Sequence, residues 1–240
     1  MGKIYKEKWE DSYSRLENNC LYPHDESVKF LNRFVRKKSS DHEHYDIMSH
    51  DGEVTRGLDY GCGVGSGVFL MDDFGIEGYG LDISEVAVAA AWVRAKEKGW
   101  EFADKFQVVD GEQIPFSDGF FEIVTSYAVL DSMPYEIAKK VILEIDRVVS
   151  RLVFLSLISG DDSRFEHKFV GEEVVSTIHE AGTIQCYYDM GKIKDLIAGT
   201  SLGIKWCAEQ RVLDSLSGEW DSRFFVVLEK EVTVLEKGGG

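Results

Sequence analysis

A glycine-rich loop preceded by a carboxylate is the first feature of this sequence that could carry chemistry. Residues 58–67 read LDYGCGVGSG, so Gly61, Gly63 and Gly65 stand at alternate positions. Such glycines let the backbone turn tightly and bring its N–H groups against a ligand at the start of a helix. Asp59 would oppose a pyrophosphate but favour a ligand with an amino or sulfonium cation. The loop therefore predicts a site for a cationic nucleoside.

The spacing of these glycines differs from that of two common nucleotide-binding loops. A dinucleotide loop has the pattern G-x-G-x-x-G, but the sixth position is Ser66 counted from Gly61 and Val68 counted from Gly63. A P-loop needs Gly-Lys-Ser/Thr, which does not follow here. A nicotinamide-dependent oxidoreductase therefore stays an alternative, with the missing third glycine against it.

Two further acids stand where a nucleoside would need them. Asp82 ends the apolar run GYGLD, and Asp110 ends the run FQVVD. A carboxylate at the first place can accept both ribose hydroxyls, and one at the second can accept an adenine amino group. Each acid alone could be a solvated strand end or a helix cap. Three acids at three successive strand ends beside a glycine loop indicate a nucleoside site.

The elements that must position these residues alternate from residue 57 onward between short apolar runs and longer amphipathic segments. This alternation is typical of βαβ units, and runs that are apolar throughout suit a parallel sheet covered on both faces. Two runs near the C-terminus leave no room for a crossover helix and must pair antiparallel. We expect helices over 85–98, 134–148 and 192–198. The expected strands are 57–60, 78–82, 106–110, 122–127, 151–159, 204–213 and 224–229.

Composition limits the kind of partner. The 240 residues include 43 acidic and 27 basic side chains, a net charge of −16 that repels nucleic acid and anionic lipid. No stretch approaches the roughly 20 apolar residues of a membrane span, and MGKIYKEKWE lacks the hydrophobic core of a signal peptide. The four cysteines form no C-x-x-C pair, so neither a disulfide framework nor a zinc site is indicated. We expect a cytoplasmic protein with neither nucleic acid nor membrane as partner.

The chain divides into three parts by pattern. Residues 1–55 are expected to form a helical cap or lid, 56–231 the main domain with an insertion at about 160–190, and 232–240 a tail. Tyr13 lies in an aromatic stripe of the first part. Such stripes usually face a core, but Tyr13 could instead close the lid over a ligand.

The three blocks LDYGCGVGSG, GYGLDIS and VVDGEQIPFSDGFFEIVTSYAVLDSMP, in this order, resemble class I S-adenosylmethionine-dependent methyltransferases. The resemblance covers about residues 57–159, and the two C-terminal runs extend it to Glu229. It implies an α/β, Rossmann-like, doubly wound sheet of seven strands, mostly parallel with an antiparallel last strand, and S-adenosyl-L-methionine as cofactor.

The same resemblance assigns roles within the site. It gives Asp59 and the loop glycines to the methionine moiety, Asp82 to the ribose, and Asp110 to the adenine. Tyr127 lines the cofactor and faces the acceptor. With Tyr13 of the lid added, the expected cofactor-binding residues are Tyr13, Asp59, Gly61, Cys62, Gly63, Gly65, Asp82, Ile83, Asp110, Gly111, Glu112 and Tyr127.

Two departures from the family pattern bear on the acceptor. Tyr60 stands where the family more usually has an aliphatic residue. The Asn/Asp-Pro-Pro-Tyr block typical of enzymes that methylate nucleobases or amide nitrogens is replaced by Ser-Tyr-Ala-Val at 126–129. This replacement favours a small-molecule acceptor. We expect methyl transfer to a small polar molecule, more at oxygen than nitrogen, of the sugar or secondary-metabolite type.

Methyl transfer is a direct displacement that needs a base only when the acceptor is protonated, as a hydroxyl is. The candidate catalytic residues are Tyr127, Asp131 and His179, although a histidine in such a polar insertion is more often a surface residue. An N-methyltransferase of a small amine and a non-catalytic cofactor-binding regulatory protein stay open as alternatives, as does the oligomeric state. No metal site is predicted, because His42, His44 and their neighbours lack a third ligand at a recognisable spacing.

Overall fold

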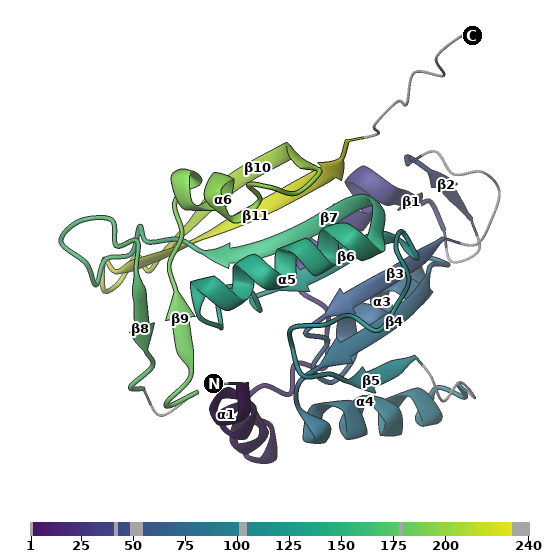
Figure 1. Cartoon of the computed structure of the whole chain (residues 1–240), viewed down its shortest axis with the longest axis horizontal. Coiled ribbons are helices and arrows are strands. Elements are labelled where there is room, and N and C mark those ends of the chain that lie inside the picture. The colour runs from purple at the N-terminus through teal and green to yellow at the C-terminus, as the bar shows by residue number, and fades with distance from the viewer. Residues whose placement is uncertain (1, 41–42, 49–54, 101–104, 178–179, 232–240) are drawn as a thin grey trace, which may run out of the picture.

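The structure, a computed structural model, describes residues 2–40, 43–48, 55–100, 105–177 and 180–231. A seven-stranded sheet in the order β10-β11-β7-β6-β3-β4-β5 runs through it (Figure 1). All strand pairs from β7 to β5 are parallel, whereas β11 is antiparallel to both of its neighbours. The predicted mostly parallel sheet with an antiparallel last strand is therefore confirmed. The strands are β3 (Arg56–Tyr60), β4 (Glu77–Asp82), β5 (Phe106–Val108), β6 (Phe121–Tyr127), β7 (Val149–Ile158), β10 (Leu202–Leu213) and β11 (Trp220–Lys230).

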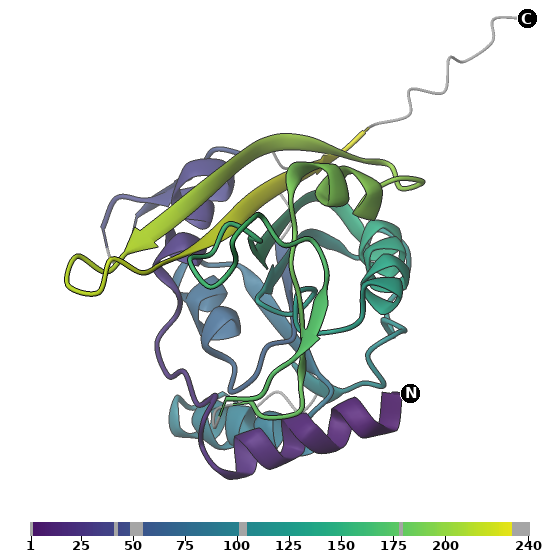
Figure 2. The same ribbon diagram turned by 90° about the vertical axis from the view of Figure 1, so that its left-hand side faces the viewer.

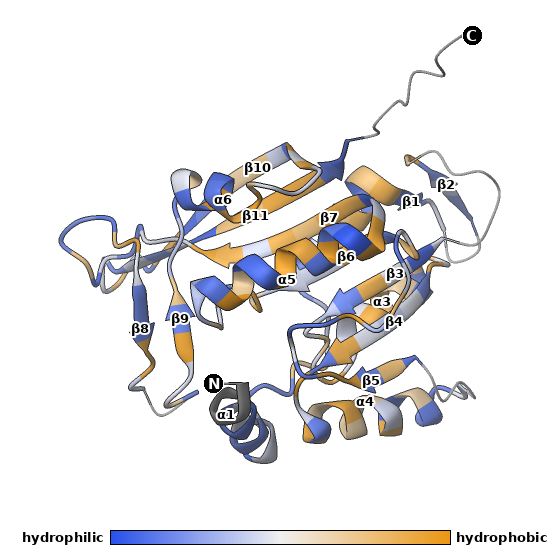
Figure 3. Cartoon of the chain, in the orientation of Figure 1, coloured by the Kyte–Doolittle hydropathy of each residue, from blue (hydrophilic) through white to orange (hydrophobic). Residues whose placement is uncertain are grey.

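Helices cover both faces of this sheet. Successive strand residues point to opposite faces, so neighbours in sequence belong to different cores. Val124 and Val153 pack with α5 and α6, while Ile123 and Leu152 pack with the helices of the opposite face. Figure 3 shows the apolar central strands enclosed between amphipathic helices. The helices that follow strands are α3 (Ser66–Asp73), α4 (Glu85–Glu97), α5 (Tyr135–Val148) and α6 (Met190–Leu196).

The N-terminal part is only partly helical, which corrects the expectation of a wholly helical segment. It contains α1 (Gly2–Ser14), α2 (Asp25–Phe30) and the π-helix η1 (Leu31–Val35), followed by a hairpin of β1 (Arg36–Lys38) and β2 (His44–Asp46). Arg36 is buried and donates hydrogen bonds to the Asp46 carboxylate and to the carbonyls of Phe74 and Gly75. This contact with the end of α3 fixes the hairpin, and nothing in the local charged sequence signals it.

The segment after β7 also contains strands that the polar sequence did not predict. β8 (Glu172–Val174) and β9 (Ile184–Cys186) form an antiparallel hairpin. The hairpin reaches away from the sheet to α1 (Figures 1 and 2). At its tip the backbone N–H of Glu180 donates to the carboxylate of Glu17 over 3.3 Å. Segments from opposite ends of the chain therefore meet at this edge of the molecule.

The buried face of α5 yields a stability prediction. Ile145 is fully buried in the core, whereas Leu143 on the same helix is half exposed. We expect Ile145→Ala to lower the free energy of unfolding by about 2–5 kcal/mol, because it removes buried methyl groups and leaves a cavity. Leu143→Ala should change it by no more than about 0.5 kcal/mol. Urea unfolding followed by circular dichroism measures both, and equal losses would contradict this account of the core.

Candidate cofactor and acceptor site

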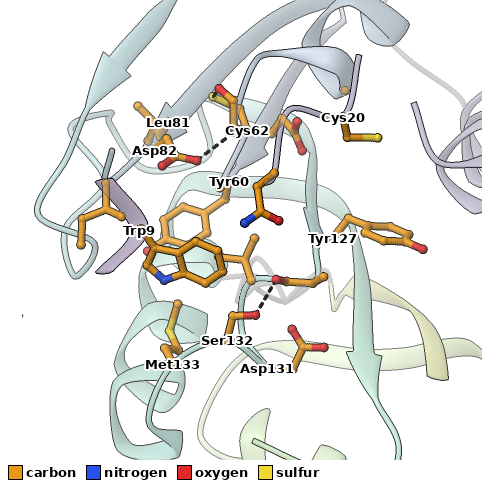
Figure 4. A pocket seen from close by; sticks show the side chains of 18 of the residues that line it. Trp9, Cys20, Tyr60, Cys62, Leu81, Asp82, Tyr127, Asp131, Ser132 and Met133 are labelled. Atoms are coloured by element: carbon orange, nitrogen blue, oxygen red, sulfur yellow. Dashed lines mark hydrogen bonds between the residues drawn. The ribbon is translucent and has the colours of Figure 1, made fainter. Parts of the chain in front are cut away.

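A cavity of about 650 Å³ opens at the carboxyl ends of β3, β4 and β6. In open α/β sheets this edge is where ligands bind, because the loops that leave the strands diverge there. Residues from α1, from the segment before α2 and from the β8–β9 hairpin complete the wall. Figure 4 shows Asp82 and Asp131 toward opposite ends of the labelled side chains. We call the end near Asp82 the cofactor end and the end near Asp131 the acceptor end.

The glycine loop lies at the cofactor end, and Gly61 and Gly63 occupy positions in which a side chain would not fit. Gly61 and Gly63 have φ of 80° and 52°, in the left-handed region. A Cβ on Gly61 would lie 2.2 Å from Val129 Cγ2, and one on Gly63 would lie 2.6 Å from the Tyr13 hydroxyl. Gly65 differs, since it is not among the residues that line the cavity and its absent Cβ makes room for Phe106. The loop is thus a bare backbone cradle.

Asp59 is a buried carboxylate in the floor of the cavity. The Thr125 hydroxyl of the neighbouring strand donates to its Oδ1 over 2.8 Å. Burial raises the pKa of Asp59 to about 6, with a smaller contribution from the charge of Asp82. A cation placed next to this buried carboxylate stabilises its ionised form, because the cation offsets the loss of hydration.

Asp82 joins the glycine loop to the start of α4. Its Oδ2 accepts from the Gly63 N–H over 2.8 Å, and its Oδ1 accepts from the Ser84 N–H over 2.9 Å. Burial raises the pKa of Asp82 to about 6 in spite of these hydrogen bonds, which act in the opposite direction. Each oxygen keeps a further lone pair, so ribose hydroxyls could donate to this carboxylate.

Asp110 stands on the wall next to the first two acids and shapes its own turn. Its Oδ1 accepts from the backbone N–H groups of Glu112 and Gln113 over 3.0 and 3.3 Å. The Tyr60 hydroxyl, unusual for the family, donates to the carbonyl of Gly111 and holds the same turn. The turn therefore leaves the other carboxylate oxygen of Asp110 available at the cavity wall.

Helix α1 covers the cofactor end. Trp9 and Tyr13 line the cavity, and Tyr13 is buried. The Glu10 carboxylate accepts from the backbone N–H groups of Glu85 and Val86 and from the Ser84 hydroxyl, over 2.6, 3.1 and 2.9 Å. It thereby caps the first turn of α4, where unpaired N–H groups favour an anion. This cap holds the lid against the domain.

A guanidinium on α4 fixes the other side of the lid segment. Arg94 donates to the carbonyl of Val64 over 2.6 Å and to the carbonyl of Leu21 over 2.8 Å. It also donates to the Ser66 hydroxyl over 3.0 Å. Arg94 therefore ties the glycine loop and the chain between α1 and α2 to one helix.

The acceptor end combines aromatic and charged groups. The rings of His24 and Tyr127 stack with centroids 3.7 Å apart and an interplanar angle of 4°. Burial lowers the pKa of His24, as does the charge of Arg223. Arg223 donates to Asp131 Oδ2 over 2.8 Å, and Asp131 is 2% exposed. The lowered pKa favours the neutral imidazole, which lies beside an ion pair of a buried carboxylate and a partly exposed guanidinium.

The structure brings nearly all predicted site residues to this cavity. Only Gly65 stands behind the wall, and His179 lies outside the described residues, as do Asp41, His42 and His50. Within the described ranges, no group of three or more His, Cys, Asp or Glu side chains could hold a metal ion. The predicted residues that line the cavity are Tyr13, Asp59, Gly61, Cys62, Gly63, Asp82, Ile83, Asp110, Gly111, Glu112, Tyr127 and Asp131.

Several lining residues were missed by the sequence reasoning. They come from segments far from the strand ends, and only Trp9, in the aromatic stripe of α1, had a recognisable signal. The others have no local pattern that predicts a site, because they reach the cavity only through the tertiary fold. The missed residues with polar or aromatic groups at the acceptor end are Glu17, Asn18, Tyr22, His24, Ser132, Glu180, Gln185 and Arg223.

Comparison with known proteins agrees with this geometry. Residues 58–155 match the family model described as a methyltransferase domain. A probable tocopherol O-methyltransferase of Oryza sativa subsp. japonica is 36% identical over 32% of this chain and 22% of its own length. Norajmaline N-methyltransferase of Rauvolfia serpentina is 26% identical over 76% of this chain and 64% of its own length. The chain therefore spans less than two thirds of either relative.

A solved structure shows the same fold. An S-adenosylmethionine-dependent methyltransferase of Methanosarcina mazei superposes with a TM-score of 0.58 and 20% identity, over 74% of this chain and 93% of that one. Residues 58–155 of this chain thus match a methyltransferase domain, and the chain shares its fold with that S-adenosylmethionine-dependent methyltransferase. The buried carboxylates at the glycine cradle are a donor set that fits this cofactor, which has both a cationic group and ribose hydroxyls.

A conservative change at Asp82 tests the cofactor end. We expect Asp82→Asn to weaken S-adenosylhomocysteine binding by about tenfold or more, because a charged hydrogen-bond acceptor is lost. Asp73→Asn, on the exposed side of α3, should bind as the wild type does. Isothermal titration calorimetry measures both, after circular dichroism has established that both variants are folded. Equal affinities would exclude Asp82 from the binding site.

The raised pKa values of Asp59 and Asp82, both about 6, predict a pH dependence of binding. A ligand that favours the ionised carboxylates lowers these pKa values, so below about pH 6 binding must displace protons. Affinity for S-adenosylhomocysteine should be constant above about pH 7 and fall as the pH decreases from 6 to 5. Calorimetry between pH 5 and 8 measures this, and Asp59→Asn should flatten the decrease. A constant affinity over the whole range would contradict the prediction.

Proposed function

We propose that this protein transfers a methyl group from S-adenosyl-L-methionine to a hydroxyl group of a small polar acceptor, of the sugar or secondary-metabolite type. The observation that supports oxygen as the target is the imidazole of His24, which lines the acceptor end of the cavity and stacks on the ring of Tyr127. A hydroxyl must lose its proton during the displacement, and a neutral imidazole can take it. The lowered pKa of His24 keeps this ring unprotonated at neutral pH.

The roles of the other candidate residues follow from their partners. Burial raises the pKa of Tyr127, so its hydroxyl stays protonated and its ring orients His24 by stacking. One oxygen of Asp131 is engaged by Arg223 and by the Ile158 N–H, which suits a binding role better than proton transfer. We therefore assign the general base to His24 and positioning roles to Tyr127 and Asp131.

The proposed reaction is a nucleophilic displacement at the methyl carbon. S-adenosylmethionine, when bound, supplies a methyl carbon that bonds to the acceptor oxygen while the carbon–sulfur bond breaks and its electron pair stays on sulfur. The chain aligns the acceptor, excludes water by means of Trp9, Tyr13 and the β8–β9 hairpin, and removes the hydroxyl proton to His24. We place this activity in the cytoplasm, since all four cysteines are free thiols.

Methylation of an amine nitrogen is the second candidate, and the carboxylates of the acceptor end support it. Release of S-adenosylhomocysteine in the presence of a hydroxyl panel and an amine panel separates the two. Turnover with compounds that carry a hydroxyl and none with amines that lack one is the expected result. Cofactor binding without turnover of either panel would favour a non-catalytic regulatory protein.

His24→Phe tests the base. The substituted ring keeps the stack on Tyr127 but has no nitrogen, so kcat should fall by about 10²–10⁴-fold while affinity for S-adenosylhomocysteine stays within about twofold. In the wild type kcat should decrease on the acid side as His24 becomes protonated, and this acid limb should vanish in the variant. His167→Phe, on an exposed loop, is the control with unchanged kcat. An unchanged kcat in His24→Phe would reject the assignment.

A further inference from the structure

The acceptor end of the cavity has an excess of negative charge. Glu17, Asp131 and Glu180 contribute carboxylates to its wall, and Arg223 contributes the one guanidinium among the described lining residues of the cavity. Arg223 is already committed, since its Nη1 donates to Asp131 Oδ2 over 2.8 Å and to the Ser156 hydroxyl over 3.1 Å. Glu17 is also paired, since Arg15 Nε donates to its Oε1 over 2.7 Å. Among the described residues, Glu180 is therefore the carboxylate of this set without a guanidinium partner, and it gives the acceptor end its negative charge.

Asp131 contains an unused acceptor atom. Its Oδ2 receives hydrogen bonds from Arg223 and from the Ile158 N–H, but its Oδ1 is buried and has no hydrogen-bond partner within the described structure. Leaving a buried carboxylate oxygen unpaired is unfavourable. Asp131 lines the cavity, and Figure 4 shows its carboxylate turned toward the group of pocket side chains. The arrangement calls for a hydrogen-bond donor supplied from the cavity.

Glu180 stands at the tip of the β8–β9 hairpin in a strained conformation. Its φ of 60° is unusual for a residue other than glycine, and such strain is retained mainly at functional sites. Ala128, which also lines the cavity, and Leu16, next to Glu17, are the other two described non-glycine residues with positive φ. Burial raises the pKa of Glu180, and the negative charges of Asp131 and Glu17 raise it further. A hydrogen bond from Asn18 lowers it by less than burial raises it. Glu180 is thus held close enough to Asp131 for the two carboxylates to interact electrostatically.

We propose that the acceptor carries a protonated amine, which binds between Glu180 and the free oxygen of Asp131 while its hydroxyl lies toward His24. The substrate class is then a small hydroxylated amine, and this inference rests on the proposed function. An ammonium group has three donors and no acceptor, so it suits two facing carboxylates. A carboxylate acceptor would instead face Glu180, and among the described lining residues Arg223 is already paired with Asp131. The net charge of −16 also steers cationic molecules toward the protein.

The test compares probes that differ only in one terminal group. Tyramine, tyrosol and 4-hydroxyphenylacetate share a phenol ring and end in an ammonium, a hydroxyl and a carboxylate. An aliphatic pair, 3-aminopropan-1-ol and propane-1,3-diol, covers acceptors without a ring. Each is titrated by calorimetry into the full chain saturated with S-adenosylhomocysteine. The ammonium member of at least one set should bind about tenfold tighter than its neutral partner, and 4-hydroxyphenylacetate should bind weakest.

Glu180→Gln should abolish this preference while leaving affinity for S-adenosylhomocysteine within about twofold. Glu172→Gln removes a charge from the same hairpin outside the cavity and should keep the preference. Glu180 is chosen because Asp131 belongs to a buried ion pair whose loss could unfold the chain. The inference is overturned if no ammonium probe binds better than its neutral partner, or if the two variants behave alike. Absence of S-adenosylhomocysteine binding to the wild type would instead overturn the proposed function itself.

Discussion

The site depends on one interaction, the buried carboxylate of Asp82 bridging the glycine loop and the start of α4. One oxygen accepts from the Gly63 N–H and the other from the Ser84 N–H. Ser84 in turn donates to Glu10 of the lid helix and accepts from the Ala87 N–H. A continuous hydrogen-bond network therefore runs from the lid through α4 to the cradle, and the lid cannot shift without disturbing the carboxylate.

The same burial that fixes Asp59 and Asp82 also sets the preference for the ligand. Both pKa values rise to about 6, so ionising the two carboxylates in the free protein is opposed by lost hydration. A cationic ligand with hydroxyl groups supplies the positive charge and the hydrogen-bond donors that stabilise these carboxylates in place of water. The methyltransferase domain match and the shared fold agree with a cofactor of this chemical character.

The acceptor end is built differently, because its residues come from segments that lie far apart in the sequence. His24 precedes the sheet, Asp131 follows β6, and Arg223 belongs to the last strand. The β8–β9 hairpin adds Glu180, whose backbone N–H donates to the carboxylate of Glu17.

The sequence by itself determined the sheet and the cofactor end. A strand followed by a glycine loop and a helix places Asp59, Asp82 and Asp110 at one edge through local chain geometry alone, and the structure brings them together there. Tyr127 and Asp131 were predicted from their place at and after the fourth strand. Tertiary structure alone, however, decided that His24, Glu180 and Arg223 join them and that the β1–β2 hairpin forms. His24 stacks on Tyr127, and Arg36 becomes a buried anchor, only when segments distant in the sequence pack together. Burial and pairing of this kind depend on three-dimensional neighbours, which no local spacing encodes.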